Sequence, residues 1–174
     1  RRPPGEFEIP DLTYQRHAIQ IEGEPTVLVD APGVFAPGRL DAGTESLIVA
    51  MEIAPGSDVL DLGCGSGLAG LTAARRGADV VMTDVSARAV ESAGRTLQAN
   101  GVTRAEARLS PGAFVVADAA VDTVIANPPF HQGHDVNYEV SQLFVSEAAR
   151  VLKSRGDLFL VANNFLPYPK WLRA

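Results

Sequence analysis

The stretch that decides the fold is SDVLDLGCGSGLAGLTAARRGADVVMTD, residues 57–84. Its apolar letters over 59–62 predict a buried strand, which a glycine-rich loop follows directly. A helix is expected over 68–76, because a glycine at the next position is a common helix C-terminus. A second strand is expected over 79–83, and it ends on Asp84. A strand, a helix and a strand at this spacing predict a parallel pair joined by a right-handed crossover.

The same alternation of strand and helix continues along the chain. The further elements that the sequence predicts are a helix from Thr44 closed by Pro55 and Gly56, a helix over 87–99 with Ser86 as its N-cap, strands over 105–109 and 121–126, a helix over 138–152 terminated by Gly156, a strand over 158–162 and a helix near Pro169. The expected fold class is therefore α/β, with a doubly wound, mostly parallel sheet.

The N-terminal part of the chain does not follow this alternation. It begins with a proline-rich, polar arm that we expect to be loosely held. Strand-like runs around 17–21 and 26–29 flank a Gly-Glu-Pro turn at 23–25, which predicts a hairpin. We therefore divide the chain into an arm with a hairpin, residues 1–30, and a main domain, residues 31–174.

The composition is that of an ordinary globular protein. Of 174 residues, 46% are hydrophobic and 21% are charged, enough for one domain with a sizeable core. No apolar run approaches the roughly 20 residues of a membrane span, so no membrane association is expected. The lone cysteine, Cys64, excludes an internal disulfide and suits a reducing cytoplasm. A net charge of −6 gives no global attraction to nucleic acid, so an RNA partner would need a local basic face or another protein.

The glycine loop predicts a nucleotide-type ligand. Gly63, Gly65 and Gly67 let the backbone pass close to a ligand at a helix N-terminus, where free N–H groups favour a carboxylate or phosphate. Asp84 ends the neighbouring strand, and its acceptor-only side chain can bind both hydroxyls of a ribose. Asp61 precedes the first glycine, where it can organise the loop and a methionine amino group.

Two cofactor classes fit this loop. Gly65, Gly67 and Gly70 also match the dinucleotide pattern G-x-G-x-x-G, so nicotinamide or flavin binding is a competitor. A glycine-rich turn needed only for tight helix packing is the plainest alternative. Asp61 inside the strand, together with an amine holder downstream and no obvious hydride acceptor site, favours S-adenosylmethionine over a dinucleotide.

That amine holder is the sequence NPPF at the end of the strand VDTVIA, residues 121–126. The two prolines, Pro128 and Pro129, fix a stiff turn that displays Asn127 at the carboxyl end of the strand, where open parallel sheets bind ligands. The Asn127 amide oxygen and the Pro128 carbonyl can accept both hydrogens of a flat NH2 group, while Phe130 stacks on its plane. The alternative is an ordinary Asn-Pro turn after a strand.

These motifs resemble a known family. DLGCGSG, DVSA and NPPF are similar to class I S-adenosylmethionine-dependent methyltransferases that act on planar amino or amide nitrogens. The longer strings APGVFAPGRLDAGT, NPPFHQG and VANNFLPY resemble the methyltransferase small domain, and within it the branch that methylates guanine N2 of ribosomal RNA. The resemblance spans Gly33 to Tyr168 and implies a Rossmann-like sheet.

The resemblance also implies residue roles, and it implies no metal. The residues that would bind the cofactor are Asp41, Thr44, Asp61, Gly63, Gly65, Gly67, Asp84, Val85 and Asn127. The residues that would hold the target amine are Asn127, Pro128, Pro129 and Phe130. Of these, the stretch around Asp41 and Thr44 would close over the cofactor.

The sequence departs from the family pattern in three places. The family carries Asp or Asn near the adenine after a Ser, whereas Ser110 is followed by Pro111, so Asp118 or a backbone carbonyl would have to replace that contact. Related RNA enzymes carry a second copy of the domain where this chain has only an arm. The family also closes its sheet with two more strands, which this sequence, ending at Ala174 and lacking a starting Met, does not contain. We therefore expect that the chain has been shortened.

The expected function is transfer of a methyl group from S-adenosylmethionine to guanine N2 of ribosomal RNA in the cytoplasm. Two alternatives remain: the same chemistry on a protein glutamine or a small-molecule amine, and a dinucleotide-dependent oxidoreductase or non-catalytic nucleotide-binding module. His131 and His134 are interpreted as structural or substrate-contacting residues, not bases. Cys64 is interpreted as a small packing residue, not a nucleophile.

Overall fold

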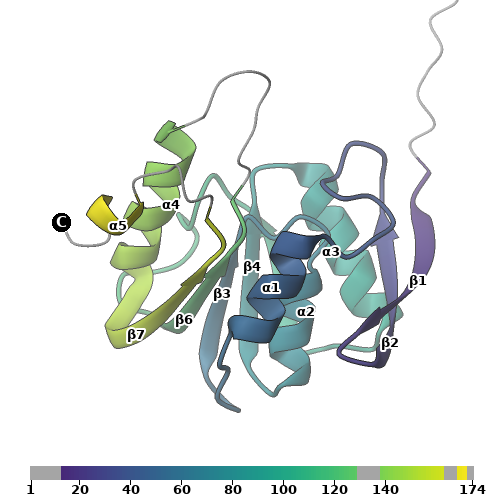
Figure 1. Ribbon diagram of the computed structural model, residues 1–174, viewed down its shortest axis with the longest axis horizontal. Helices are drawn as coiled ribbons and strands as arrows, with labels where there is room; N and C mark the ends of the chain where they lie inside the picture. Colours follow the sequence, from purple (N-terminus) through teal and green to yellow (C-terminus); the bar gives the residue numbers. More distant parts are fainter. Residues whose placement is uncertain (1–12, 129–137, 163–167, 172–174) are drawn as a thin grey trace, which may run out of the picture.

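The computed structural model describes residues 13–128, 138–162 and 168–171. Its centre is a five-stranded parallel sheet with the order β5-β4-β3-β6-β7, and a two-stranded antiparallel hairpin lies beside it (Figure 1). The strands are β1 (Gln15–Ile21), β2 (Glu24–Asp30), β3 (Asp58–Leu62), β4 (Asp79–Asp84), β5 (Ala105–Leu109), β6 (Val121–Ala126) and β7 (Leu152–Leu160).

Helices connect the strands and cover both faces of the sheet. They are α1 (Ala42–Ala50), α2 (Leu68–Arg75), α3 (Ala87–Ala99), α4 (Tyr138–Val151) and α5 (Tyr168–Trp171). Helices α1, α2 and α3 gather on one side, while α4 lies near β6 and β7 (Figure 1). The expected α/β fold class with a mostly parallel sheet is confirmed. No helix among the described residues has both the length and the apolarity to cross a membrane.

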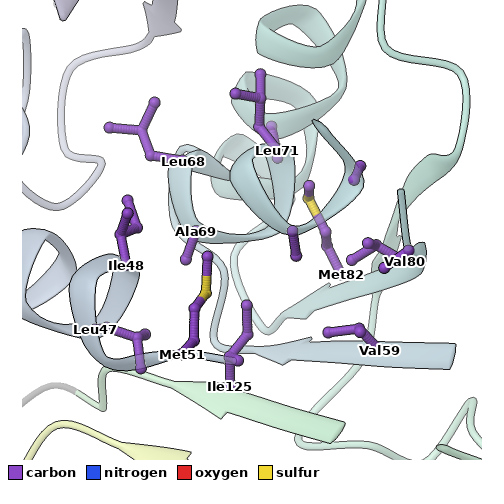
Figure 2. Packing of buried hydrophobic residues seen from close by; sticks show 14 of the residues in the cluster. Leu47, Ile48, Met51, Val59, Leu68, Ala69, Leu71, Val80, Met82 and Ile125 are labelled. Atoms are coloured by element: carbon purple, nitrogen blue, oxygen red, sulfur yellow. The ribbon is translucent and has the colours of Figure 1, made fainter. Parts of the chain in front are cut away.

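The central strands β3 and β6 are buried on both faces, because helices cover both sides of this doubly wound sheet. Val59 and Ile125 face a core built with α1, α2 and α3 (Figure 2). Leu60 and Val124, their neighbours along the two strands, face a second core built with α4. Successive strand residues point to opposite faces, so continuous apolar runs such as these can fill two cores at once.

The hairpin packs on α3. Glu22 and Gly23 form its turn with φ angles of 52° and 82°, as a two-residue turn between antiparallel strands requires. The turn therefore lies one residue earlier than expected, and the expected turn residues Glu24 and Pro25 belong to β2. The Val29 N–H donates to Thr96 Oγ1 of α3 at 3.0 Å. The division of the chain at residue 30 stays a prediction.

Three helix boundaries differ from the expectation. Helix α1 begins at Ala42 and not at Thr44, because Asp41 is its N-cap. It ends at Ala50, before Pro55. Helix α4 passes directly into β7, so Gly156 lies inside a strand and does not terminate a helix.

Gly156 is explained by close strand packing. A Cβ at this position would lie 2.9 Å from the Asp122 carbonyl oxygen, which leaves no space for a side chain. The pairing of β6 and β7 shifts its register between Val121 and Thr123, next to this close approach. The glycine therefore marks an irregularity within the sheet.

Candidate functional site

The carboxyl ends of the central strands meet at one edge of the sheet. In the parallel ladders, Leu62 pairs with Thr83 on one side and with Ala126 on the other. The residues that follow these three, Gly63, Asp84 and Asn127, are therefore brought together. The chain runs from β3 to β4 and β5 on one side and then crosses to β6 on the other side of β3, and such a switch point is where open α/β sheets bind ligands.

A cavity of about 330 Å³ lies at this edge. This volume is at the lower end of the ~300–1,000 Å³ of small-molecule sites. Of the residues that the sequence nominated, those that line it are Asp41, Thr44, Asp61, Gly63, Gly65, Asp84, Val85, Asn127 and Pro128. Pro129 and Phe130 lie outside the described residues, as do His131 and His134.

Backbone hydrogen bonds hold the glycine loop against β4. The N–H groups of Gly63 and Cys64 both donate to the Thr83 carbonyl, at 2.8 and 2.9 Å. The Gly65 N–H donates to Asp84 Oδ2 at 3.0 Å. Gly63 has a φ of 76°, and a Cβ there would lie 2.8 Å from Cζ of Phe144. A glycine is therefore required at this point of the loop.

Gly67 differs from the expectation because it is absent from the cavity lining. It is the N-cap residue of α2 with a φ of 82°, and a Cβ there would lie 2.9 Å from Cβ of Ala93 on α3. Its role in the structure is close packing of two helices, which the letter pattern alone does not distinguish from ligand contact.

Asp61 is buried beneath the loop, with 3% of its surface exposed. Its Oδ2 accepts the Gly70 N–H at 2.9 Å, so a residue of β3 satisfies a free N–H in the first turn of α2. Burial raises the pKa of Asp61 from 3.8 to about 7, and the negative charge of Asp84 adds to this rise. Within the described part of the chain, no cationic side chain lowers the pKa of Asp61.

Gly70 is the third glycine of the dinucleotide pattern. A Cβ there would lie 2.9 Å from Asp61 Oδ2 and 2.5 Å from Cε of Met82. Helix-to-strand packing therefore explains this glycine without any dinucleotide.

The charges around the cavity suit a cationic ligand. Asp41, Asp61 and Asp84 line it, whereas Arg39 is the one cationic side chain among the described lining residues. Two phosphates of a dinucleotide would add negative charge to this set, which costs free energy in a partly desolvated site. A ligand with positive charge would lower the mutual repulsion of the carboxylates.

Two buried hydroxyls in the wall lack a hydrogen-bond partner within the described part of the chain. They are Thr83 Oγ1 and Ser110 Oγ, whose residues are 0% and 1% exposed. A buried unpaired hydroxyl is costly, so a polar ligand in the cavity would offset that cost.

Cys64 also lines the cavity. Burial, followed by the nearby charges of Asp61 and Asp84, raises the pKa of its thiol well above the usual range. The thiol therefore stays protonated, in agreement with the interpretation that Cys64 is not a nucleophile.

Asn127 is held from one side. Its Nδ2 donates to Asp41 Oδ1 at 3.2 Å and to Thr44 Oγ1 at 3.0 Å. Its Oδ1 has no hydrogen-bond partner among the described residues. The display of Asn127 at the end of β6 follows the sequence expectation, but the contacts with α1 were not foreseen.

Sequence reasoning missed the wall that α4 contributes. Val140, Leu143 and Phe144 line the cavity. The sequence predicts this helix, but its residues were not expected in the site, and Phe144 belongs to the second core as well as to the cavity wall. In the loop before α1, Arg39 was also missed, although it lines the cavity with Phe35 and the anticipated Asp41.

Asp118 does not replace the acid expected near Ser110. Its Oδ1 accepts from Arg150 Nη1 at 2.6 Å, and it is absent from the cavity lining. Arg150 also donates to the Ala113 carbonyl at 2.8 Å and to Glu147 Oε2 at 2.8 Å. Asp118 therefore belongs to a clamp that attaches the segment after β5 to α4.

Fold and site together define an α/β domain with a nucleotide-type pocket at the switch point of a parallel sheet. The chain belongs to the methyltransferase small domain family, whose model matches residues 25–174. The resemblance based on the motifs is thereby confirmed.

Two of the curated relatives share one name, ribosomal RNA small subunit methyltransferase C. A ribosomal RNA small subunit methyltransferase C of Hahella chejuensis is 47% identical over 176 residues, covering 99% of this chain and 51% of the relative. One of Stutzerimonas stutzeri is 40% identical over 162 residues, covering 91% and 48%. The chain therefore spans about half the length of the curated relatives it matches.

Solved structures agree on the fold. The T. thermophilus 16S rRNA N2 G1207 methyltransferase, RsmC, in complex with AdoMet and guanosine, has a TM-score of 0.85 and 34% identity. The match covers 98% of this chain and 46% of that one. A ribosomal protein L11 methylase from Lactobacillus delbrueckii, at 22% identity and a TM-score of 0.61, shares the fold.

Proposed function

We propose that this protein transfers a methyl group from S-adenosylmethionine to a planar exocyclic nitrogen, and that the acceptor is guanine N2 of ribosomal RNA in the cytoplasm. The observation that carries the proposal is the Asn127 carboxamide, whose NH2 end is bound to Asp41 and Thr44 while its oxygen has no partner among the described residues. The family membership and the names of the relatives support it.

The cavity lining fits this cofactor. Asp61, with an elevated pKa and no cationic partner among the described residues, would hold the amino group of the methionine part. Asp84, at the end of β4, would accept hydrogen bonds from the ribose hydroxyls. The unpartnered hydroxyls of Thr83 and Ser110 would bind polar atoms of the cofactor. Ser110 thus takes the place of the acid that Pro111 cannot supply.

The dinucleotide alternative has less support. Its third glycine is required by packing against Asp61 and Met82, and the lining carries three carboxylates. A pyrophosphate would meet Arg39 as its one positive partner among the described lining residues. The charge of the cavity is therefore better suited to a cationic cofactor.

When bound, the cofactor supplies a methyl group on a positively charged sulfur. The protein would position the acceptor with Asn127 Oδ1 and the Pro128 carbonyl, which each accept one hydrogen of the amino group. An exocyclic amino nitrogen is nearly planar, and two acceptors fixed at one strand end orient its lone pair and stabilise the developing positive charge. A strong base is unnecessary, since the methylated nitrogen loses its proton readily to water.

The rim of the cavity offers contacts for a larger acceptor. Phe35 is 64% exposed although it is aromatic and lines the cavity. Arg39, four residues later, is also exposed and has no ion-pair partner among the described residues. An exposed aromatic ring can stack on a nucleobase. A guanidinium without an ion-pair partner can bind a phosphate.

Two measurements test the proposal. Calorimetry with S-adenosylhomocysteine and with NADH distinguishes the cofactor classes, and we expect binding of the first alone. Transfer of a labelled methyl group is then measured with deproteinised 16S ribosomal RNA, with assembled small subunits and with ribosomal proteins. Label in guanine supports the proposal. Label in protein glutamine or in a small amine would replace RNA by the alternative acceptors, and binding of NADH alone would overturn methyl transfer.

A further inference from the structure

One carboxylate oxygen connects a helix cap to the acceptor-holding amide. Asp41 Oδ1 accepts the N–H groups of Gly43 and Thr44, at 3.0 and 3.1 Å, and so caps α1. The same oxygen accepts from Nδ2 of Asn127, 86 positions further along the chain. Thr44 Oγ1 accepts from the same nitrogen at 3.0 Å. The first turn of α1 thus binds one end of the Asn127 carboxamide.

The chemistry of Asp41 determines which end that is. An ionised carboxylate has no hydrogen to donate, so only the NH2 end of a carboxamide can face it. If the carboxamide of Asn127 were turned over, two oxygens would face each other where Nδ2 now lies 3.2 Å from Asp41 Oδ1. The Asn127 Oδ1, which has no partner among the described residues, is therefore turned away from Asp41.

Gly43 provides the space for this arrangement. A Cβ at Gly43 would lie 3.0 Å from both Asn127 Nδ2 and Asp41 Oδ1, and 3.1 Å from Asn127 Oδ1. The carboxamide therefore lies directly against the backbone of α1. This contact leaves little freedom for the amide to rotate.

We propose that Asp41 and Thr44 are positioning residues, which fix the Asn127 carboxamide with its oxygen available to the acceptor amino group. The inference rests on the proposed function and assigns these two residues to the acceptor side, where the family resemblance implied a contact with the cofactor. Asp41 also makes an amide necessary at position 127, because an aspartate there would place two carboxylates side by side.

The first test exchanges the charged partner. Asn127→Asp should lower turnover at least about 100-fold, since like charges in contact destabilise the arrangement. Adding Asp41→Asn should recover at least about tenfold, because it removes one of the two negative charges that would lie in contact, while its amide oxygen can still cap α1. If the double variant is no more active than Asn127→Asp, Asp41 does not orient residue 127.

The second test separates the acceptor from the cofactor. Thr44→Val keeps the shape and removes the hydroxyl, so we expect kcat to fall about tenfold while the Kd of S-adenosylhomocysteine changes less than about twofold. Thr44→Ser should restore kcat. Ser46→Ala is the matched control and should match the unaltered protein, because the one hydrogen bond of this hydroxyl within the described ranges goes to the Ala42 carbonyl of the same helix. A weaker Kd with unchanged kcat would instead assign Thr44 to the cofactor.

Thermal unfolding of the charge-exchange variants at pH 8 needs no acceptor. Asn127→Asp should lower Tm by roughly a few degrees, and Asp41→Asn in the same chain should remove that loss. If this coupling appears but the unaltered protein methylates no RNA, the proposed acceptor fails while the positioning contact stands. If RNA is methylated but neither turnover nor Tm shows the coupling, the positioning proposal fails alone.

Discussion

The substitution Asp61→Asn should make the protein more stable at pH 8, and should stabilise it less at pH 5. Asp61 is 3% exposed, and its pKa is raised from 3.8 to about 7, first by burial and then by the charge of Asp84. Such a rise corresponds to roughly 4 kcal/mol between the folded and unfolded states. Asparagine has nearly the same shape and keeps an oxygen that can accept the Gly70 N–H.

The sign follows from proton linkage. Between pH 4 and 7, approximately, the folded protein keeps the Asp61 proton while the unfolded chain has lost it. The free energy of unfolding therefore falls as pH rises through this window, and above it the full cost of a buried charge remains. The asparagine of the Asp61→Asn variant does not ionise, so the variant has no buried charge at this position at any pH.

Urea unfolding followed by circular dichroism at pH 5 and pH 8 measures the effect. We expect Asp61→Asn to gain roughly 2.5 kcal/mol relative to the unaltered protein between the two pH values, because pH 5 already lies inside the window in which Asp61 titrates. A difference between the two proteins that does not depend on pH would refute the assignment of a raised pKa. The same variant should bind S-adenosylhomocysteine more weakly at pH 8, because the charge that would attract its amino group is gone.

Three further predictions concern other parts of the site. Asn127→Ala should lower kcat by roughly 100-fold and leave the calorimetric Kd of S-adenosylhomocysteine nearly unchanged, and turnover at the unaltered rate would contradict its role. Arg150→Ala should lower Tm by roughly a few degrees in a thermal scan, because it opens the clamp on the segment after β5, whereas Arg16→Ala, which breaks no ion pair among the described residues, should not. Phe35→Ala and Arg39→Gln should each raise the KM for RNA several-fold without changing kcat. If both leave KM unaltered, the acceptor does not cross this rim.

Local chemistry explains why much of the fold was predictable. Helix α3 begins after Ser86, whose hydroxyl accepts the Ala89 N–H. The capping residue and the N–H that it caps are thus only three positions apart. The strand 121–126 contains four apolar residues, which fill the cores on both faces of the sheet. Wherever a boundary depends on a cap or an apolar run, the letters next to it contain the cause.

The errors at Gly156 and Gly67 arise because the cause lies elsewhere in the chain. Gly156 resembled a helix stop, but its backbone is approached by the Asp122 carbonyl of the neighbouring strand. Gly67 resembled a ligand contact, but it makes room for Ala93 of another helix. A glycine in the sequence can indicate that a neighbouring group leaves no room for a side chain, but only the tertiary structure determines which group that is.

The orientation of the Asn127 carboxamide also depends on a residue far away in the chain. The NPPF motif placed Asn127 correctly at a strand end, yet the orientation of its carboxamide depends on Asp41, 86 positions away. An amide has one donating and one accepting end, so a strand end and a stiff turn alone leave its direction undetermined. A carboxylate that caps a neighbouring helix removes this ambiguity, because it tolerates only a donor. The capping of α1 and the orientation of the amide are therefore one physical requirement, met by the same oxygen.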